Sequence, residues 1–185
     1  MIRYELDRFA FASAPRTGTT WFLKTMAILG NDIGSKATIH IPHQDPYDLI
    51  RVSFVRNPLD WLLSCYTVFS TGAAIGVPEV DIFLSLSRNS FREFIQDYLQ
   101  TCPGAVGKMF SAYRADSFIR TEDLPYGFIH SIKTMTSRKF KRTQMQQVVE
   151  LGVQNNSQKR CFWDKKQKQQ VMEAERQVME FFDYL

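Results

Sequence analysis

One short stretch of the chain has the residue types and the spacing of an anion-binding loop. Pro15–Trp21 reads Pro-Arg-Thr-Gly-Thr-Thr-Trp and lies between an apolar run, Phe9–Ala14, and a run with helical character, Thr20–Leu29. A loop between a strand and a helix presents backbone N–H groups and the positive end of the helix dipole to one spot, and both favour an anion. Gly18 allows the backbone to approach a ligand closely. The stretch therefore predicts a phosphate-binding loop, and an ordinary turn before a threonine-capped helix is the alternative.

The side chains of this loop suit the same chemistry. Arg16 supplies a planar guanidinium with a permanent charge. Three residues supply hydroxyl donors: Thr17, Thr19 and Thr20. The loop is not a Walker A loop, because Ser13 stands where that motif has its first glycine, and Thr19 rather than lysine follows Gly18.

The elements that must position this loop predict an α/β fold with a parallel sheet. Strand-like runs alternate with helix-like runs, which is the order of parallel strands joined by helical crossovers. The predicted strands are Phe9–Ala14, Ala37–Ile41, Leu49–Val55 and Ser117–Arg120. The predicted helices are Thr20–Leu29, Leu59–Ser70, Ser90–Thr101, Gly104–Arg114, Phe128–Met135, Thr143–Leu151 and one long final helix capped by Asp164. Met1–Arg8 is predicted to be a lead-in, and Thr71–Asp81 a loop.

Length and composition indicate one globular domain. The 185 residues are 44% hydrophobic and 23% charged, so a single domain over residues 1–185 is expected. No apolar run is long enough for a membrane span, and the charged first residues do not resemble a signal peptide, so we expect no membrane association. Cys65, Cys102 and Cys161 are predicted to be free thiols, which favours the cytoplasm.

Basic residues are concentrated in the last third of the chain. Lys133–Lys168 carries a net charge of +8, whereas the remainder carries −4. Such a positive field favours an anionic ligand. A nucleic acid is the rival partner, but the chain has no nucleic-acid-binding motif and a solvated basic surface is the commoner explanation, so nucleic acid is not the expected partner.

Three stretches together resemble the PAPS-dependent sulfotransferase family. Pro15–Trp21 is similar to that family's 5′-phosphosulfate loop, and Val55–Tyr66 to its 3′-phosphate motif, R-N-P-x-D-x-x-x-S-x-Y. Ile119–Leu124 resembles its R-Y-E-D-L segment, with Thr121 in the tyrosine position. A weaker similarity to bacterial members covers Asn156–Tyr184. The resemblance implies a three-layer, P-loop-like α/β domain with a central parallel sheet flanked by helices.

The resemblance also implies two sites for the two anionic groups of PAPS. Pro15–Trp21 would hold the phosphosulfate, while Arg56 and Ser64 would hold the 3′-phosphate. These two residues can converge if Arg56 ends a strand and Ser64 lies in the following helix; a carboxylate partner is the alternative for Arg56. Trp21 would stack on adenine or pack in the core. Two weaker candidates for the 3′-phosphate come from a late loop: Lys159 and Arg160.

The implied reaction is in-line transfer of a sulfuryl group from PAPS, without a metal, to a hydroxyl or amine of a small-molecule or glycan acceptor, leaving PAP. Arg16 stands where many members carry lysine, and it would stabilise the leaving phosphate electrostatically, because a guanidinium does not readily donate its proton. His40 lies in Thr38–Pro42, which resembles the segment with the family's base, and an imidazole can deprotonate an alcohol. A histidine that only hydrogen-bonds at a strand edge is the alternative. Other candidate bases are His43, Asp45 and Glu79.

Three other functions compete with this one. A P-loop kinase or nucleotide hydrolase would need the Walker lysine, which is missing. A non-catalytic module that binds PAP or another nucleotide would fit the short chain, since cytosolic sulfotransferases are longer. A nucleic-acid- or anion-binding protein would use the basic last third.

Overall fold

The structure is a computed structural model. It describes residues 2–4, 9–30, 50–72, 78–86, 90–135, 139–152 and 161–185. These residues form two compact units, each made of two segments of the chain. The first unit comprises Met1–Val55 and Ala112–Asn155, and the second comprises Arg56–Ser111 and Asn156–Leu185. The two compact units could belong to one domain or be two domains, so the single domain stays a prediction.

The first unit is built on a four-stranded sheet in the order β1-β2-β3-β4. Its strands are β1 (Ile2–Tyr4), β2 (Phe9–Phe11), β3 (Ile50–Val55) and β4 (Ser117–Arg120). The last three are parallel, with Phe11 beside Val52 and Val55 beside Arg120, and β1 is antiparallel to β2. The α/β class with a parallel sheet is therefore confirmed. The lead-in prediction is wrong, because β1 adds an edge strand there.

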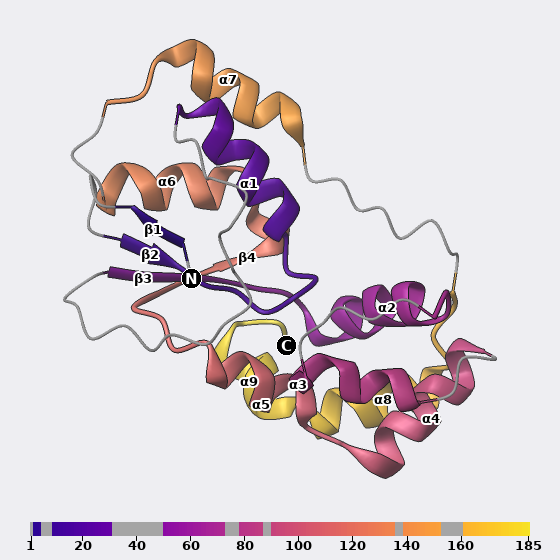
Figure 1. Cartoon of the computed structure of the whole chain (residues 1–185). Coiled ribbons are helices and arrows are strands. Elements are labelled where there is room, and N and C mark those ends of the chain that lie inside the picture. Colours follow the sequence, from indigo (N-terminus) through magenta and orange to yellow (C-terminus); the bar gives the residue numbers. More distant parts are fainter. Residues whose placement is uncertain are drawn as a thin grey trace. The chain divides into compact units, whose positions relative to one another are not determined.

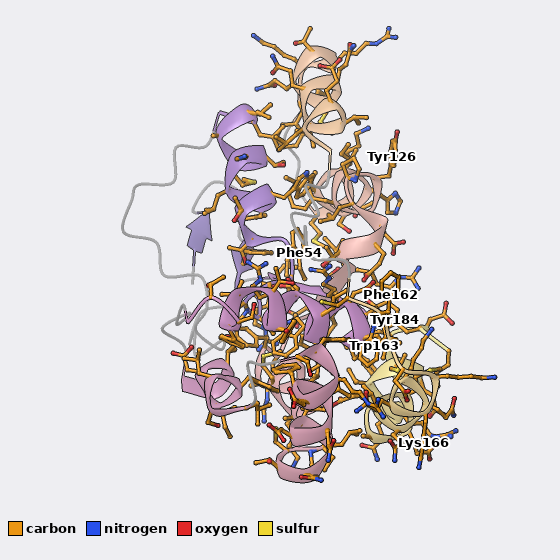
Figure 2. The ribbon with its side chains drawn as sticks, turned by 90° about the vertical axis from the view of Figure 1, so that its right-hand side faces the viewer. Phe54, Tyr126, Phe162, Trp163, Lys166 and Tyr184 are labelled. Atoms are coloured by element: carbon orange, nitrogen blue, oxygen red, sulfur yellow. The ribbon has the colours of Figure 1, made fainter. Side chains whose placement is uncertain are left out.

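Helices cover one face of this sheet (Figure 1). They are α1 (Thr19–Ile28), α6 (Tyr126–Met135) and α7 (Arg142–Leu151), which confirm three predicted helices. They pack around a cluster of aromatic rings in which Phe11 stacks on Phe22 at a centroid distance of 3.7 Å. Phe54 of β3 lies inside this cluster, whereas Tyr126 of α6 is exposed (Figure 2). The predicted strand Ala37–Ile41 falls outside the described residues, and the three-layer arrangement stays a prediction.

The second unit is helical. It contains α2 (Pro58–Phe69), α3 (Pro78–Asp81), η1 (Ile82–Ser85), α4 (Phe91–Thr101), α5 (Ala105–Ala112), α8 (Lys165–Ala174) and α9 (Arg176–Phe181). Trp61 is fully buried and makes T-shaped contacts with the Phe83 and Phe110 rings. Pro78–Asp81 was predicted to be part of a loop, and it is a short helix instead.

The single long final helix was also predicted wrongly. Asp164 caps α8 as expected, by accepting hydrogen bonds from two backbone N–H groups. The helix then ends at Ala174, and α9 begins at Arg176. Glu175, between them, leaves the helical conformation with φ −104° and ψ 13°. Its side chain is buried, with 2% of its surface exposed, because its carboxylate accepts hydrogen bonds from the N–H groups of Val106 and Gly107 at the start of α5.

Candidate functional site

The predicted phosphate loop begins at the carboxyl end of β2. Ala12 continues the pairing with β3 by donating its N–H to the Val52 carbonyl at 3.2 Å. The buried Ser13 hydroxyl then accepts a hydrogen bond from the Phe54 N–H at 3.2 Å and lies 2.9 Å from the Phe54 carbonyl oxygen. Because the carboxyl ends of parallel strands are where ligands bind in α/β sheets, the loop starts at a favourable place.

The Thr17 side chain has a structural role within the loop. Its hydroxyl lies 2.5 Å from the Ala14 carbonyl oxygen and 2.5 Å from the Ser13 hydroxyl oxygen, and Thr17 is completely buried. This differs from the predicted role of a hydroxyl donor to the ligand. The hydroxyl instead closes the turn, and the backbone N–H of Thr17 is the group that remains for an anion.

Gly18 is required by both its conformation and its surroundings. It has φ +99° and immediately precedes α1. A Cβ at this position would lie 3.3 Å from Phe54 Cδ2 and 3.4 Å from Leu124 Cδ1. Arg16, also with positive φ at 67°, makes the preceding turn. A side chain on Gly18 would therefore be strained and would press on the core.

The backbone of this loop has unused donors. Five consecutive N–H groups, from Thr17 to Trp21, have no acceptor within the part of the chain that the structure describes. No side chain of the described ranges caps α1, and its first turn contains no acidic residue. By contrast, side-chain oxygens accept from backbone N–H groups at the starts of α2, α4, α5 and α8. The residues that supply them are Asn57, Ser90, Glu175 and Asp164.

A buried hydroxyl without a partner lies at the same place. Thr19, the first residue of α1, is 8% exposed, and its hydroxyl has no hydrogen-bond partner among the described residues. Leaving such a group unpaired costs free energy, about 1–3 kcal/mol. An anion held by the N–H groups of the loop would give this hydroxyl an acceptor. The hydroxyl of Thr20 is on an exposed residue.

Trp21 is a core residue in this structure. Only 5% of its surface is exposed, and its ring makes a T-shaped contact with the Phe128 ring at a centroid distance of 5.4 Å. It also lies 6.2 Å from the Phe54 ring centroid. These contacts correspond to the core-packing alternative that was open for Trp21, and its indole N–H has no acceptor among the described residues.

Thr121 contacts the loop from outside it, a role that the sequence did not indicate. It follows β4, is 5% exposed, and stands in the position of the tyrosine in the family's motif. Its hydroxyl lies 2.9 Å from the Thr17 carbonyl oxygen and 2.9 Å from the Val55 carbonyl oxygen. The only sequence signal was the replacement of a large aromatic residue by a small hydroxylated one.

The remaining predicted binding residues are Arg56 and Ser64, which belong to the second unit. Arg56 directly follows β3 and is half-buried. Ser64 lies in α2 and is 2% exposed. The two conditions for their convergence are therefore met: Arg56 stands at the end of a strand, and Ser64 lies in the helix that follows. Asn57 between them starts α2 by accepting from the Leu59 N–H at 2.9 Å.

Several predicted site residues lie outside the described residues. These are His40, His43, Asp45, Lys159 and Arg160, together with the side chain of Glu79. Their roles stay predictions. Among the residues that the structure does describe, no group of three histidine, cysteine, aspartate or glutamate side chains could hold a metal ion. Cys65, Cys102 and Cys161 form no disulfide within the described residues.

No protein-family model, curated protein or solved structure matches this chain. Within the described ranges, no helix is both long enough and apolar enough to cross a membrane. The loop and the resemblance of its sequence are therefore the features that point to a function.

Proposed function

We propose that the chain is a PAPS-dependent sulfotransferase, which transfers a sulfuryl group to a hydroxyl or amine of an acceptor. The observation that carries the proposal is the run of N–H groups from Thr17 to Trp21, which have no acceptor among the described residues, at a helix start that no described side chain caps. Backbone donors and a helix N-terminus together form an anion site. The buried hydroxyl of Thr19, which has no hydrogen-bond partner in the part of the chain that the structure describes, supports it independently.

The residues take the following roles in this proposal. The N–H groups of the loop and the Thr19 hydroxyl bind the 5′-phosphosulfate, and Arg16 stabilises the charge that develops on the leaving phosphate. Arg56 and Ser64, taken over from the sequence motif, bind the 3′-phosphate. Lys159 and Arg160 are the weaker candidates for that group. Trp21 is left out of the binding set, because its ring packs in the core.

The transfer step needs a base for the acceptor, and His40 is proposed for it. The sulfuryl group passes from the phosphate oxygen of PAPS to the acceptor oxygen or nitrogen, the acceptor proton goes to the imidazole, and PAP leaves. The protein mainly positions the reactants and stabilises charge in such a transfer. We also propose that the chain folds as a three-layer, P-loop-like α/β domain and that the protein is cytoplasmic.

Calorimetric titration tests the donor site. PAP is titrated into the protein with EDTA present, and ATP with Mg²⁺ is titrated in parallel. We expect PAP to bind without a metal at micromolar concentration or below, and ATP with Mg²⁺ to bind far more weakly. Binding of ATP with Mg²⁺ and none of PAP would replace this proposal by a kinase-like function. PAP binding without transfer to any acceptor would favour a non-catalytic PAP-binding module.

His40→Ala tests the base separately. Since the imidazole is assigned to the acceptor proton and not to the donor, we expect this variant to bind PAP as the wild type does and to lose turnover. Full activity of the variant would assign the base elsewhere, with His43→Ala and Asp45→Asn as the next variants.

A further inference from the structure

The carbonyl oxygen of Thr17 and the N–H of Gly18 belong to one peptide group. A trans peptide group is planar, so these two groups point in opposite directions. The Thr17 carbonyl lies 2.9 Å from the buried hydroxyl of Thr121. The Gly18 N–H consequently points away from Thr121, and it has no acceptor within the described residues.

We propose that Thr121 is a positioning residue that fixes the direction of the Thr17–Gly18 peptide group, so that the Gly18 N–H is held ready for the anion. This inference rests on the proposed donor site. The opposite orientation of the same peptide would present a carbonyl oxygen to the anion and repel it. Gly18 has little steric resistance to such a turn, because glycine accepts conformations on both sides of φ zero.

Thr121 is itself held in place by the sheet. It immediately follows β4, whose residue Arg120 pairs with Val55 of β3. The Thr121 hydroxyl lies 2.9 Å from the Val55 carbonyl oxygen as well as 2.9 Å from that of Thr17. One hydroxyl proton is therefore shared between the end of the central strand and the phosphate loop, and the loop takes its orientation from the rigid sheet.

Loss of this hydroxyl should turn the peptide group. In Thr121→Val the shape is kept, but the Thr17 carbonyl loses the Thr121 donor. A buried carbonyl without a donor is costly, so the peptide is free to turn toward another partner. Hydrogen bonds to a charged group contribute about 1.5–3 kcal/mol, so the loss of the Gly18 N–H from the site corresponds to about a tenfold or greater rise in the Kd for PAP.

Selective labelling makes the Gly18 N–H visible. Thr-Gly occurs at two places in the sequence, Thr17-Gly18 and Thr71-Gly72. Protein labelled with carbonyl-¹³C threonine and ¹⁵N glycine therefore gives two amide signals in a carbonyl-filtered spectrum. Gly72 is an internal control, because its N–H donates to the Phe69 carbonyl at 2.8 Å. We expect PAP to shift the Gly18 signal and to leave the Gly72 signal in place.

Three variants complete the test, and a fourth is held in reserve. Thr121→Val should raise the Kd for PAP about tenfold or more and abolish the PAP-induced shift of Gly18 at saturation. Thr121→Ser, which keeps the hydroxyl, should restore both. Val148→Ala removes buried atoms from α7, far along the chain from the loop, and should lower the Tm without changing either readout. Thr121→Cys, whose thiol is a weak donor, replaces the valine variant if that protein does not fold.

The outcomes separate this inference from the proposed function. If wild-type protein shows no PAP binding by calorimetry, the proposed function fails. If wild-type protein binds PAP and Thr121→Val binds it equally tightly with the same Gly18 shift, the donor site survives and the role of Thr121 is wrong. A Gly18 signal that does not respond to bound PAP in the wild type also overturns the role of Thr121.

Discussion

Gly18 combines two constraints at one residue, a positive φ and close contact with Phe54 and Leu124. For Gly18→Ala we expect a loss of about 1–2 kcal/mol in the free energy of unfolding from the left-handed backbone alone. We also expect PAP affinity to fall, because the N–H groups on either side of Gly18 are displaced. Urea denaturation and calorimetry measure the two effects.

Gly152→Ala is the matched control for that variant. Gly152 also has positive φ, at 56°, but the nearest atom to its added Cβ is the Glu150 carbonyl oxygen at 3.9 Å. The Gly152→Ala variant should be less stable than the wild type and should bind PAP with the same affinity. Equal PAP affinity in Gly18→Ala and Gly152→Ala would contradict the assignment of Gly18 to the binding loop.

Thr19 should show a conflict between stability and binding. Thr19→Val removes a buried hydroxyl that has no described partner, so the free energy of unfolding without ligand should rise, by about 1 kcal/mol. The same variant should bind PAP more weakly, because the hydroxyl is then missing from the site. Denaturation without ligand measures the change in the free energy of unfolding, and calorimetry measures the change in PAP affinity.

Thr25 offers the control within the same helix. It is also buried in α1, and its hydroxyl also has no partner among the described residues. Thr25→Val should raise the stability in the same way and leave PAP binding unchanged. A Thr19→Val protein that binds PAP as tightly as Thr25→Val would remove Thr19 from the proposed site.

At the scale of single residues, the loop was predictable and its anchors were not. The glycine and threonine pattern between a strand and a helix pointed to Gly18 and Thr19 directly. The roles of Thr17 and Thr121 depend on hydrogen bonds to carbonyl groups whose positions only the fold defines; Thr121 lies 104 residues from its partner Thr17. Trp21 suited two roles equally, and burial by Phe54 and Phe128 places it in the core.

At the scale of elements, the final helix was the main error. The spacing of apolar residues such as Val171, Val178 and Met179 suggested one continuous helix, and these three residues are buried. Glu175 interrupts it because its carboxylate serves as the cap of α5, whose Gly107 lies 68 residues away in the chain. Short-range spacing contains no information about such a contact. Six helices, α1, α2, α4, α5, α6 and α7, begin within two residues of their predicted starts, because their apolar periodicity and caps are local.

Glu175 should make stability depend on pH. Burial raises the pKa of its carboxyl group above the usual value of 4.5, although hydrogen bonds from Tyr98 and from three backbone N–H groups act in the opposite direction. A raised pKa means that the folded state holds the proton more tightly than the unfolded state. This contribution to stability is fully present below pH 4.5 and is lost as the pH rises through the raised pKa.

The comparison with Glu175→Gln measures this contribution. We expect the free energy of unfolding of the wild type, relative to Glu175→Gln, to decrease as the pH rises from about 4.5 toward neutrality. Glu180→Gln, which replaces an exposed glutamate of α9, is the matched control variant. A wild-type profile parallel to that of Glu175→Gln would show that Glu175 titrates as it does in the unfolded chain.

At the scale of the whole molecule, PAP should stabilise the fold by mass action. A ligand at one hundred times its Kd adds about 2.7 kcal/mol to the free energy of unfolding. For a chain of this length that corresponds to a rise of about 5–10 °C in Tm. Differential scanning calorimetry with PAP and EDTA measures it, and ATP with Mg²⁺ at the same concentration should raise the Tm much less. An unchanged Tm with saturating PAP would contradict binding to the folded state.

The order of elements was predictable over the described part of the chain, whereas its division into units was not. Parallel strands and their helices follow from local patterns, from Phe9 to Arg120. The pairing of Met1–Val55 with Ala112–Asn155, and of Arg56–Ser111 with Asn156–Leu185, depends on contacts between distant segments. Even the edge strand β1 was missed, since only three residues pair there.

This interleaving has a consequence for how the protein is made. A ribosome produces the Pro15–Trp21 loop early, but β4 and Thr121 emerge about a hundred residues later. Until then the nascent chain carries the loop without the strand end that orients it. Ligand affinity should therefore arise late in translation and abruptly, once Thr121 can reach Thr17. Neither unit corresponds to one uninterrupted stretch of the gene. A single cut anywhere between the codons of Thr17 and Thr121 would separate the loop from its anchor.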